Sequence, residues 1–341
     1  MRRARFKVPP DRPVGYYHCI SRCVEGRFVF RDVESEHFLK LMREFEEFCE
    51  VRVLTFCLMS NHFHILLEVP KRPDILPGAE AILSKLERLT GFQDPGTARQ
   101  ELELYRRMND VEAEKAWLER YYRRMWDVSA FMKLLKQRFS QWYNRRAERK
   151  GTLWQERFKS VLVDGAGDAL TTIAAYIDLN PVRAGIVKDP KDYRWSGYGE
   201  AVAGQDRAGG GLQFIVRALQ GGAEASIGKS LELYRMFIFQ EGSEEREGRT
   251  EEGTPSRGAL KRAEVLRVIQ EKGRLPVSDY LRCRVRYFCD GAVLGSKGYV
   301  DEVFKAYRER FGEKRKTGAR RLRGLEEPLY ALRDLRLKVF G

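Results

Sequence analysis

The sequence predicts an α+β protein with an antiparallel sheet at its centre. Two strand-like segments, 51–59 and 62–69, are joined only by Ser60-Asn61, and strands joined that closely pair as an antiparallel hairpin. Segments with helical periodicity lie before and after this hairpin. These elements predict a protein of both strands and helices, with at least one antiparallel pair of strands.

The first two predicted elements are a strand and a helix. Tyr16–Arg22 is apolar and aromatic and follows Pro13 and Gly15, which predicts a strand. A helix is predicted from about Ser35 to Glu50, with Ser35 as its cap. Its apolar residues fall on one helical face: Phe38, Leu41, Met42, Phe45 and Phe48.

Residues 71–127 interrupt this pattern. Pro73, Pro77 and Gly78 break the chain, and two stretches dense in charged residues follow, at about Ala79–Leu89 and Thr97–Met125. They predict a helical hairpin that is inserted into a smaller fold.

The pattern of helix and strand resumes after the insertion. Ser129–Arg149 has helical periodicity and ends at Lys150-Gly151, a helix-stop signal. Ser160–Asp164 predicts a short strand. Asp168–Leu179 predicts a helix that Asn180-Pro181 stops, because the residue before a proline avoids the helical conformation.

Changes in composition predict three domains. Residues 1–200 form the first domain, and 201–256 a helical segment and linker that is acidic and glycine-containing at its end. Residues 257–341 form a basic, mainly helical C-terminal DNA-binding domain, with 22 lysines and arginines against 11 aspartates and glutamates. Leu260–Gln270 and Val277–Leu281 allow a pair of helices similar to a helix-turn-helix motif.

Charge favours a nucleic-acid partner. The formal net charge is +14, and a basic protein of this size seeks a polyanion, although a merely soluble basic surface is the alternative. No apolar run approaches the roughly 18 residues of a membrane span, and the N-terminus lacks the apolar region of a signal peptide. These features predict no membrane partner and a cytoplasmic location, with the six cysteines as reduced thiols.

Two histidines share one face of a predicted strand. In Asn61-His62-Phe63-His64, side chains alternate, so His62 and His64 point the same way. Two imidazoles in this position can hold one divalent ion. Because the motif is short, a structural role stays open. His18 lies in the first strand and could border the site, but core packing or a hydrogen bond is the simpler role. His37 lies early in a helix, where an exposed position is expected.

A tyrosine and an asparagine share one face of a later helix. Tyr176 and Asn180 are four residues apart. The tyrosine can act as a nucleophile, and the amide oxygen one turn later can complete a metal shell. The alternative is that Tyr176 packs in the core and Asn180 only ends the helix.

Five segments together resemble the REP-associated tyrosine transposases. These proteins are insertion-sequence-200-like transposases, within the HUH single-strand endonucleases. The resemblance covers roughly residues 12–200, apart from the insertion. The segments are Tyr16–Arg22 (YYHCISR), Cys57–Leu67 (CLMSNHFHILL), Gly151–Ser160 (GTLWQERFKS), Tyr176–Val187 (YIDLNPVRAGIV) and Asp192–Tyr198 (DYRWSGY).

The resemblance implies a ferredoxin-like fold and a nuclease mechanism. In this family a divalent ion, magnesium or manganese, polarises the scissile phosphate of single-stranded or hairpin DNA, and a tyrosine becomes linked to the 5′ phosphate. By position it assigns His62, His64 and Asn180 as metal ligands and Tyr176 as the nucleophile. A homodimer is one possible assembly.

Two other functions compete with a transposase. A domesticated descendant would bind DNA hairpins without transposing, but both histidines, Tyr176 and Asn180 are retained. A replication initiator or relaxase often carries a helicase, and the sequence contains no GxxxxGK[ST] phosphate loop.

Basic residues near aromatic ones predict the DNA contacts, since single-stranded DNA is held by cations on phosphates and aromatic rings on bases. The alternative for each group is a solvated charged face. In the first domain the candidates are Arg22, Arg138, Arg145, Arg146, Arg157, Lys159 and Arg183. In the C-terminal region they are Arg284, Arg286, Lys314, Arg315, Lys316, Arg320 and Arg321.

Overall fold

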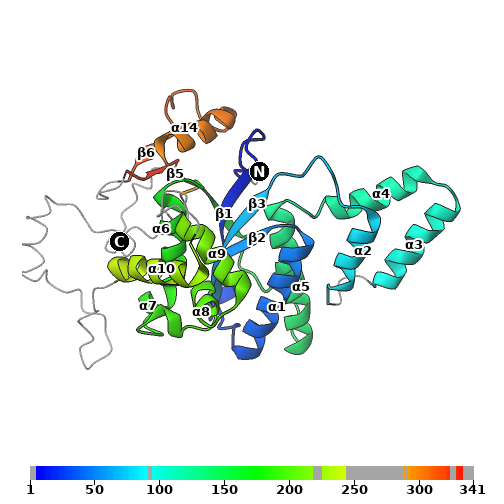
Figure 1. The fold of residues 1–341 in the computed structure, drawn as a ribbon, viewed down its shortest axis with the longest axis horizontal. Helices are drawn as coiled ribbons and strands as arrows, with labels where there is room; N and C mark the ends of the chain where they lie inside the picture. The colour runs from blue at the N-terminus through cyan, green and yellow to red at the C-terminus, as the bar shows by residue number, and fades with distance from the viewer. Residues whose placement is uncertain are drawn as a thin grey trace, which may run out of the picture.

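Four antiparallel strands form the centre of the fold (Figure 1). The computed structural model describes residues 5–90, 94–217, 225–242, 288, 291–322 and 328–332. The four strands lie in the order β2-β3-β1-β4. They are β1 (Val14–Arg22), β2 (Arg52–Met59), β3 (His62–Pro70) and β4 (Lys159–Val163).

Two helices complete a ferredoxin-like arrangement. α1 (Asp32–Phe48) connects β1 to β2, and α5 (Val128–Arg146) precedes β4. The order strand, helix, strand, strand, helix, strand with β1 and β3 in the middle is that of the ferredoxin-like fold. The predicted α+β class and the β2–β3 hairpin are therefore confirmed.

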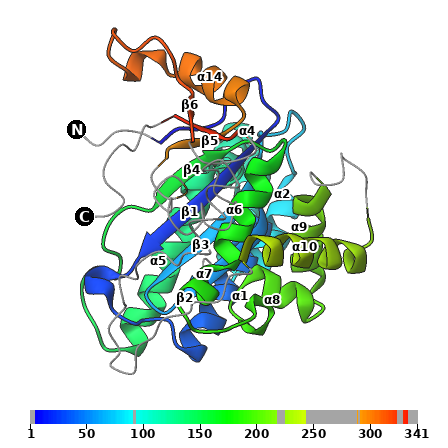
Figure 2. The ribbon, with the colours of Figure 1, turned by 90° about the vertical axis from the view of Figure 1, so that its left-hand side faces the viewer.

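The sheet is covered on both faces. The face that carries Phe63, Ile65 and Leu67 packs against α1 and α5 in one apolar core. The opposite face, which carries Leu66 and Val161, packs against a second group of helices in another core. Figure 2 shows α6 and α9 of this group beside the strands. The group comprises α6 (Asp168–Asp178), α7 (Asn180–Arg183), α8 (Gly197–Val202), α9 (Asp206–Arg217) and α10 (Ile227–Gly242).

The insertion contains three helices where the sequence predicted two. They project beyond α1 and α5 (Figure 1) and are α2 (Ala79–Glu87), α3 (Pro95–Arg107) and α4 (Val111–Tyr122). The second predicted stretch breaks because Asn109 adopts a positive φ of 52° and the Asp110 side chain accepts a hydrogen bond from the Ala113 amide. This arrangement ends α3 and begins α4.

The C-terminal region adds strands to the same sheet. β5 (Val293–Gly295) pairs parallel with β4, and β7 (Tyr330–Ala331) pairs antiparallel with β5 and with β6 (Arg320–Arg321). The four strands of the core are antiparallel, as predicted, and the sheet becomes mixed where β5 is added to it. β4 would otherwise be an open edge, and the apolar residues Val293 and Leu294 cover it.

The described part of the C-terminal region is not mainly helical. It contains β5, β6, β7, one α-helix, α14 (Lys297–Ala306), and the short 3-10 helix η4 (Arg308–Arg310). The helix-turn-helix pair predicted within 260–281 lies outside the described residues. The three-domain division stays a prediction, although the sheet continues across its last boundary.

Capping differs from the prediction at α1. This helix begins at Asp32, and Ser35 is buried within it, with its amide bonded to the Arg31 carbonyl. Ser35 is therefore not the cap. Two other short 3-10 helices are η1 (Val24–Gly26) and η2 (Pro190–Asp192).

Two further expectations concern cysteines and membranes. Cys19, Cys23, Cys49 and Cys57 are buried free thiols, as predicted, whereas the remaining two cysteines lie outside the described residues. No helix in the described ranges has the length and apolar character to cross a membrane.

Candidate catalytic site

The structure brings the predicted histidines and tyrosine together. His62 and His64 lie on the central strand β3, on the face that α6 covers, and Tyr176 lies on α6. The ring centroids of His64 and Tyr176 are 5.7 Å apart, and those of His62 and His64 are 5.1 Å apart. Residues from two distant segments therefore form one cluster.

His62 is oriented by its neighbour in the chain. Its Nδ1 lies 2.7 Å from the Asn61 Oδ1, and the Asn61 Nδ2 donates to the Gly26 carbonyl. Because the amide oxygen can only accept, the His62 ring donates from Nδ1. Its Nε2 is then the nitrogen that offers a lone pair.

His18 borders the cluster and makes a buried hydrogen bond there, which is the role that the sequence favoured for it. It is fully buried on β1, and its Nε2 lies 2.9 Å from the His64 Nδ1. Its other nitrogen, Nδ1, lies 2.9 Å from the Phe288 carbonyl oxygen. The His64 Nε2 is buried and has no hydrogen-bond partner among the described residues.

The three imidazoles are held in the neutral form. Burial lowers the pKa of His18 to about 4. Burial, reinforced by Arg22 and Arg183, lowers the pKa of His62 to about 4 as well. Burial also lowers the pKa of His64 well below its usual range. Neutral imidazoles are the form that binds metals.

Asn180 is the first residue of α7, one turn after Tyr176, and is almost buried. Its Nδ2 donates to the carbonyls of Tyr176 and Ile177, at 3.0 and 3.1 Å, and so closes the end of α6. Asn180 therefore stabilises the predicted end of α6 through side-chain hydrogen bonds to its last carbonyls. The Asn180 Oδ1, the atom suited to a metal, is not used in these bonds.

Two side chains cover the tyrosine ring. The Arg183 Cζ lies 4.5 Å from the centroid of Tyr176, and the Arg183 Nη1 is buried without a partner in the described ranges. The Phe288 ring stacks on Tyr176 with centroids 5.1 Å apart. Tyr176 is only 2% exposed. Sequence reasoning missed Phe288 because nothing local links it to a residue so far away.

The described part of the chain contains no group of three His, Cys, Asp or Glu side chains that suits a metal ion. The ligand set predicted from the sequence is the two imidazoles, at His62 and His64, and the amide oxygen of Asn180. Imidazole and amide oxygen are compatible with several divalent ions.

Comparison with known proteins finds a family model that is similar to the histidine-bearing segment. Residues 13–86 match the family model described as "Transposase IS200 like". This segment is therefore similar to the IS200-like transposases over less than half of the chain. It contains β1, α1 and the β2–β3 hairpin with both histidines, and it ends before Tyr176.

Other comparisons add less. No curated protein matches the chain. One matching solved structure is described as "Structure of the REP associates tyrosine transposase bound to a REP hairpin", with 13% sequence identity and a TM-score of 0.35. The match covers 60% of this chain and 87% of that one. A likeness at this level does not establish a shared function.

The predicted DNA contacts of the first domain are spread over several elements. Arg22 is exposed and pairs in register with His62, and Arg183 lies over Tyr176. Arg138 is half-buried and donates to Gln141. The others are exposed: Arg145, Arg146, Arg157 and Lys159. Among these candidates, Arg22 adjoins the cluster of histidines and Tyr176 through strand pairing with His62, and Arg183 adjoins it through its contact with the Tyr176 ring.

The C-terminal candidates differ among themselves. Lys314, Lys316, Arg320 and Arg321 are exposed. Arg315 donates to the carbonyls of Thr317, Gly318 and Leu332, so its guanidinium holds the local chain together. Arg284 and Arg286 lie outside the described residues.

A buried carboxyl anchors the tyrosine helix. Asp178 is fully buried and accepts hydrogen bonds from the hydroxyls of Thr55 on β2, at 2.8 Å, and Tyr234 on α10, at 2.6 Å. Burial raises its pKa to about 7. The sequence contained no sign of this role, because it depends on three elements meeting.

Asp178 should make stability depend on pH. Its ordinary pKa is 3.8, so above that pH the folded protein holds a proton that the unfolded chain releases. The contribution of Asp178 to the free energy of unfolding is therefore fully present below pH 3.8 and is lost as the pH rises through about 7. Asp178→Asn removes the titration with little change in volume. Between pH 5 and 8 the wild type should lose more unfolding free energy than the variant, by at most about 1.4 kcal/mol per pH unit. Denaturant titrations at both pH values measure this, and parallel losses would contradict it.

Proposed function

We propose that the protein is a transposase-like endonuclease and strand transferase that acts on single-stranded DNA at REP-type hairpins. Tyr176 is the nucleophile, and His62, His64 and Asn180 hold magnesium or manganese. The observation that carries the proposal is the cluster of Tyr176 with both histidines. The ring centroids of His64 and Tyr176 are 5.7 Å apart, and the His64 Nε2 is buried without a hydrogen-bond partner among the described residues. The family match of residues 13–86 and the motifs near Tyr176 support it.

The proposed step breaks one ester bond and forms another. The Tyr176 hydroxyl loses its proton and attacks the phosphorus, and the bond to the 3′ oxygen breaks. The 5′ phosphate is then linked to Tyr176, and the 3′ oxygen takes a proton. Since one phosphodiester replaces another, a 3′ hydroxyl can reverse the step and join strands.

The residues of the site suit this step. A tyrosine hydroxyl, with an ordinary pKa of about 10, is a weak nucleophile near neutral pH. A bound divalent ion would supply positive charge to the scissile phosphate. Neutral imidazoles at His62 and His64 leave that charge uncompensated, and the unpartnered Nη1 of Arg183 offers the phosphate a charged hydrogen bond beside Tyr176.

A denaturing gel tests the function. The full chain is incubated with labelled hairpin-forming single strands and magnesium, and a covalent protein–DNA adduct is expected. A hairpin-binding protein without strand transfer is the second candidate, and the burial of Tyr176 beneath Phe288 favours it. Binding in a native gel without any adduct would select this second function.

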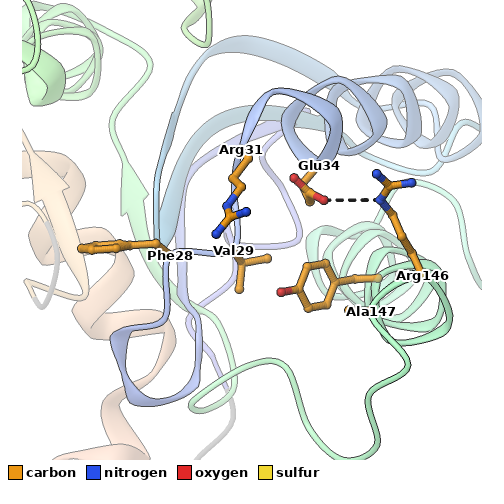
Figure 3. Close-up of a pocket in the computed structure, with 7 residues that line it drawn as sticks. Phe28, Val29, Arg31, Glu34, Arg146 and Ala147 are labelled. Carbon is orange, nitrogen blue, oxygen red and sulfur yellow. Dashed lines mark ion pairs between the residues drawn. The ribbon is translucent and has the colours of Figure 1, made fainter.

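A surface hollow offers a path for the DNA strand. It has a volume of about 470 Å³ and is lined by Phe28, Val29, Arg31, Glu34, Tyr143, Arg146 and Ala147. Figure 3 shows Arg31, Glu34 and Arg146 around it, with the last two joined by an ion pair. Phe28 is 72% exposed, unusual for a large apolar residue.

The segment that lines the hollow is hydrogen-bonded to the turn that precedes the two histidines. The Phe30 amide donates to the Ser60 carbonyl at 2.9 Å, so the segment around Phe28 is tied to the turn between β2 and β3. Arg31 is exposed, and it lines the hollow. We infer that an unpaired base stacks on Phe28 while Arg31 holds a phosphate.

Phe28→Ala and Arg31→Gln should each weaken binding of a short single strand. One stacked base is worth about 1–3 kcal/mol, so Phe28→Ala should raise the Kd about fivefold or more. Fluorescence anisotropy in EDTA separates binding from cleavage. Arg107→Gln is the control, since Arg107 is exposed on α3 and its guanidinium donates to the Glu103 carbonyl of the same helix. If Arg31→Gln and Arg107→Gln lose the same DNA affinity and Phe28→Ala loses none, overall charge explains the binding and the site at Phe28 and Arg31 is excluded.

A further inference from the structure

His18 is a buried polar residue for which the catalytic step has no direct use. It lies on β1 between the His64 ring and the backbone of residue 288, and it is fully buried. The centroids of the His18 and His64 rings are 5.1 Å apart, and the rings are nearly parallel at 21°. A neutral histidine with both nitrogens in hydrogen bonds has a fixed proton position.

The hydrogen bonds determine that position step by step. The Phe288 carbonyl can only accept, so His18 carries its proton on Nδ1. The neutral His18 ring then has a bare lone pair on Nε2, which accepts from the His64 Nδ1 at 2.9 Å. His64 is therefore protonated on Nδ1, and its Nε2 is unprotonated. This is the same buried nitrogen that has no partner in the described structure.

We propose that His18 is a positioning residue, which holds His64 in the Nδ1-protonated tautomer so that its Nε2 can bind the metal. The backbone carbonyl of Phe288 fixes the tautomer of His18, and His18 in turn fixes the tautomer of His64. The catalytic role of this arrangement rests on the proposed function. The tautomer itself follows from the hydrogen bonds alone.

The two histidines are thus oriented by different means. His62 is oriented by Asn61, its neighbour in the same turn. His64 is oriented by a chain of contacts that ends at residue 288, in the region predicted to be a separate domain. The C-terminal region therefore contributes to the metal site without supplying a ligand. Partners of this kind typically affect metal affinity about 10–100-fold.

The first test is the tautomer of His64 in the protein without metal or DNA. Long-range proton–nitrogen NMR on histidine-labelled protein distinguishes the two ring nitrogens, and the chain has only four histidines. At neutral pH we expect His64 to be protonated on Nδ1 and bare on Nε2. A proton on His64 Nε2 in the wild type would overturn the proposal, with no variant required.

The second test compares two variants at His18. His18→Gln keeps a donor for the Phe288 carbonyl and an acceptor for the His64 Nδ1, whereas His18→Phe keeps a ring and removes both. Manganese binding, measured by electron paramagnetic resonance, should weaken about 10–100-fold in His18→Phe and stay near the wild-type value in His18→Gln. Thermal unfolding checks that both variants fold.

The outcomes separate this inference from the proposed function. Equal manganese affinity in all three proteins, or an unchanged His64 tautomer in His18→Phe, would overturn the role of His18. If His64 has the expected tautomer and the wild type binds no manganese, the claim that His18 positions His64 for a metal is wrong. The metal part of the proposed function is then wrong as well. The tautomer assignment then stands as a structural finding.

Discussion

Tyr176→Phe should abolish the covalent adduct with hairpin DNA while leaving DNA binding intact. The substitution removes one hydroxyl and keeps the ring that packs against Phe288 and lies beneath Arg183. Because no other atom of residue 176 can form an ester with the phosphate, the expected loss is complete rather than partial. A denaturing gel measures the adduct, and a native gel measures binding in the same samples.

Tyr16→Phe is the matched control. Tyr16 lies on β1, on the same sheet face, and stacks on Phe214 with ring centroids 5.8 Å apart. Its loss of a hydroxyl should leave the adduct unchanged. An undiminished adduct in Tyr176→Phe would falsify the nucleophile assignment, and a loss in both variants would point to a general effect on the fold.

His62→Ala and His64→Ala should each remove cleavage, and a chelator should do the same to the wild type. Each substitution deletes a neutral imidazole that the proposal assigns to the metal. The loss should exceed the 10–100-fold typical of residues that only orient a ligand. Adduct formation across a manganese titration measures it, since a weakened site can respond to excess metal.

The two variants differ in what they cost the fold. His64 is 2% exposed, so its replacement by alanine also leaves a cavity and lowers stability. His62 is only partly buried and gives the cleaner test. His37→Ala is the control and should leave cleavage unchanged. The His37 ring stacks on Trp142, with ring centroids 3.9 Å apart, away from the cluster. Cleavage that survives both substitutions and the chelator would exclude this metal site.

The sequence by itself determined the local features of this protein. Alternation along 62–69 placed His62 and His64 on one face, and the short connection at Ser60-Asn61 predicted the hairpin that the structure contains. The spacing of Tyr176 and Asn180 is also local, because residues four apart share a helix face. These features need only the repeat of a strand or a helix, which a few neighbouring residues define.

Local patterns were less reliable where an end or a count depended on context. The break between α3 and α4 rests on one residue, Asn109, with a positive φ. The cap of α1 was misplaced because Ser35 packs inward, where a favourable capping residue has no special role. In both places the backbone hydrogen bonds of the folded chain differ from those that the local sequence predicted.

Only the tertiary structure decided which distant residues complete the site. His18 meets His64 through the pairing of β1 with β3, Phe288 covers Tyr176, and Asp178 joins β2, α6 and α10. The apolar pair Val293 and Leu294 extends the sheet beyond β4 in the same way. Strand register and helix packing bring these residues together across long stretches of chain. A periodic pattern in the sequence fixes the face on which a side chain lies, but it contains no information about which side chain from another segment will lie opposite.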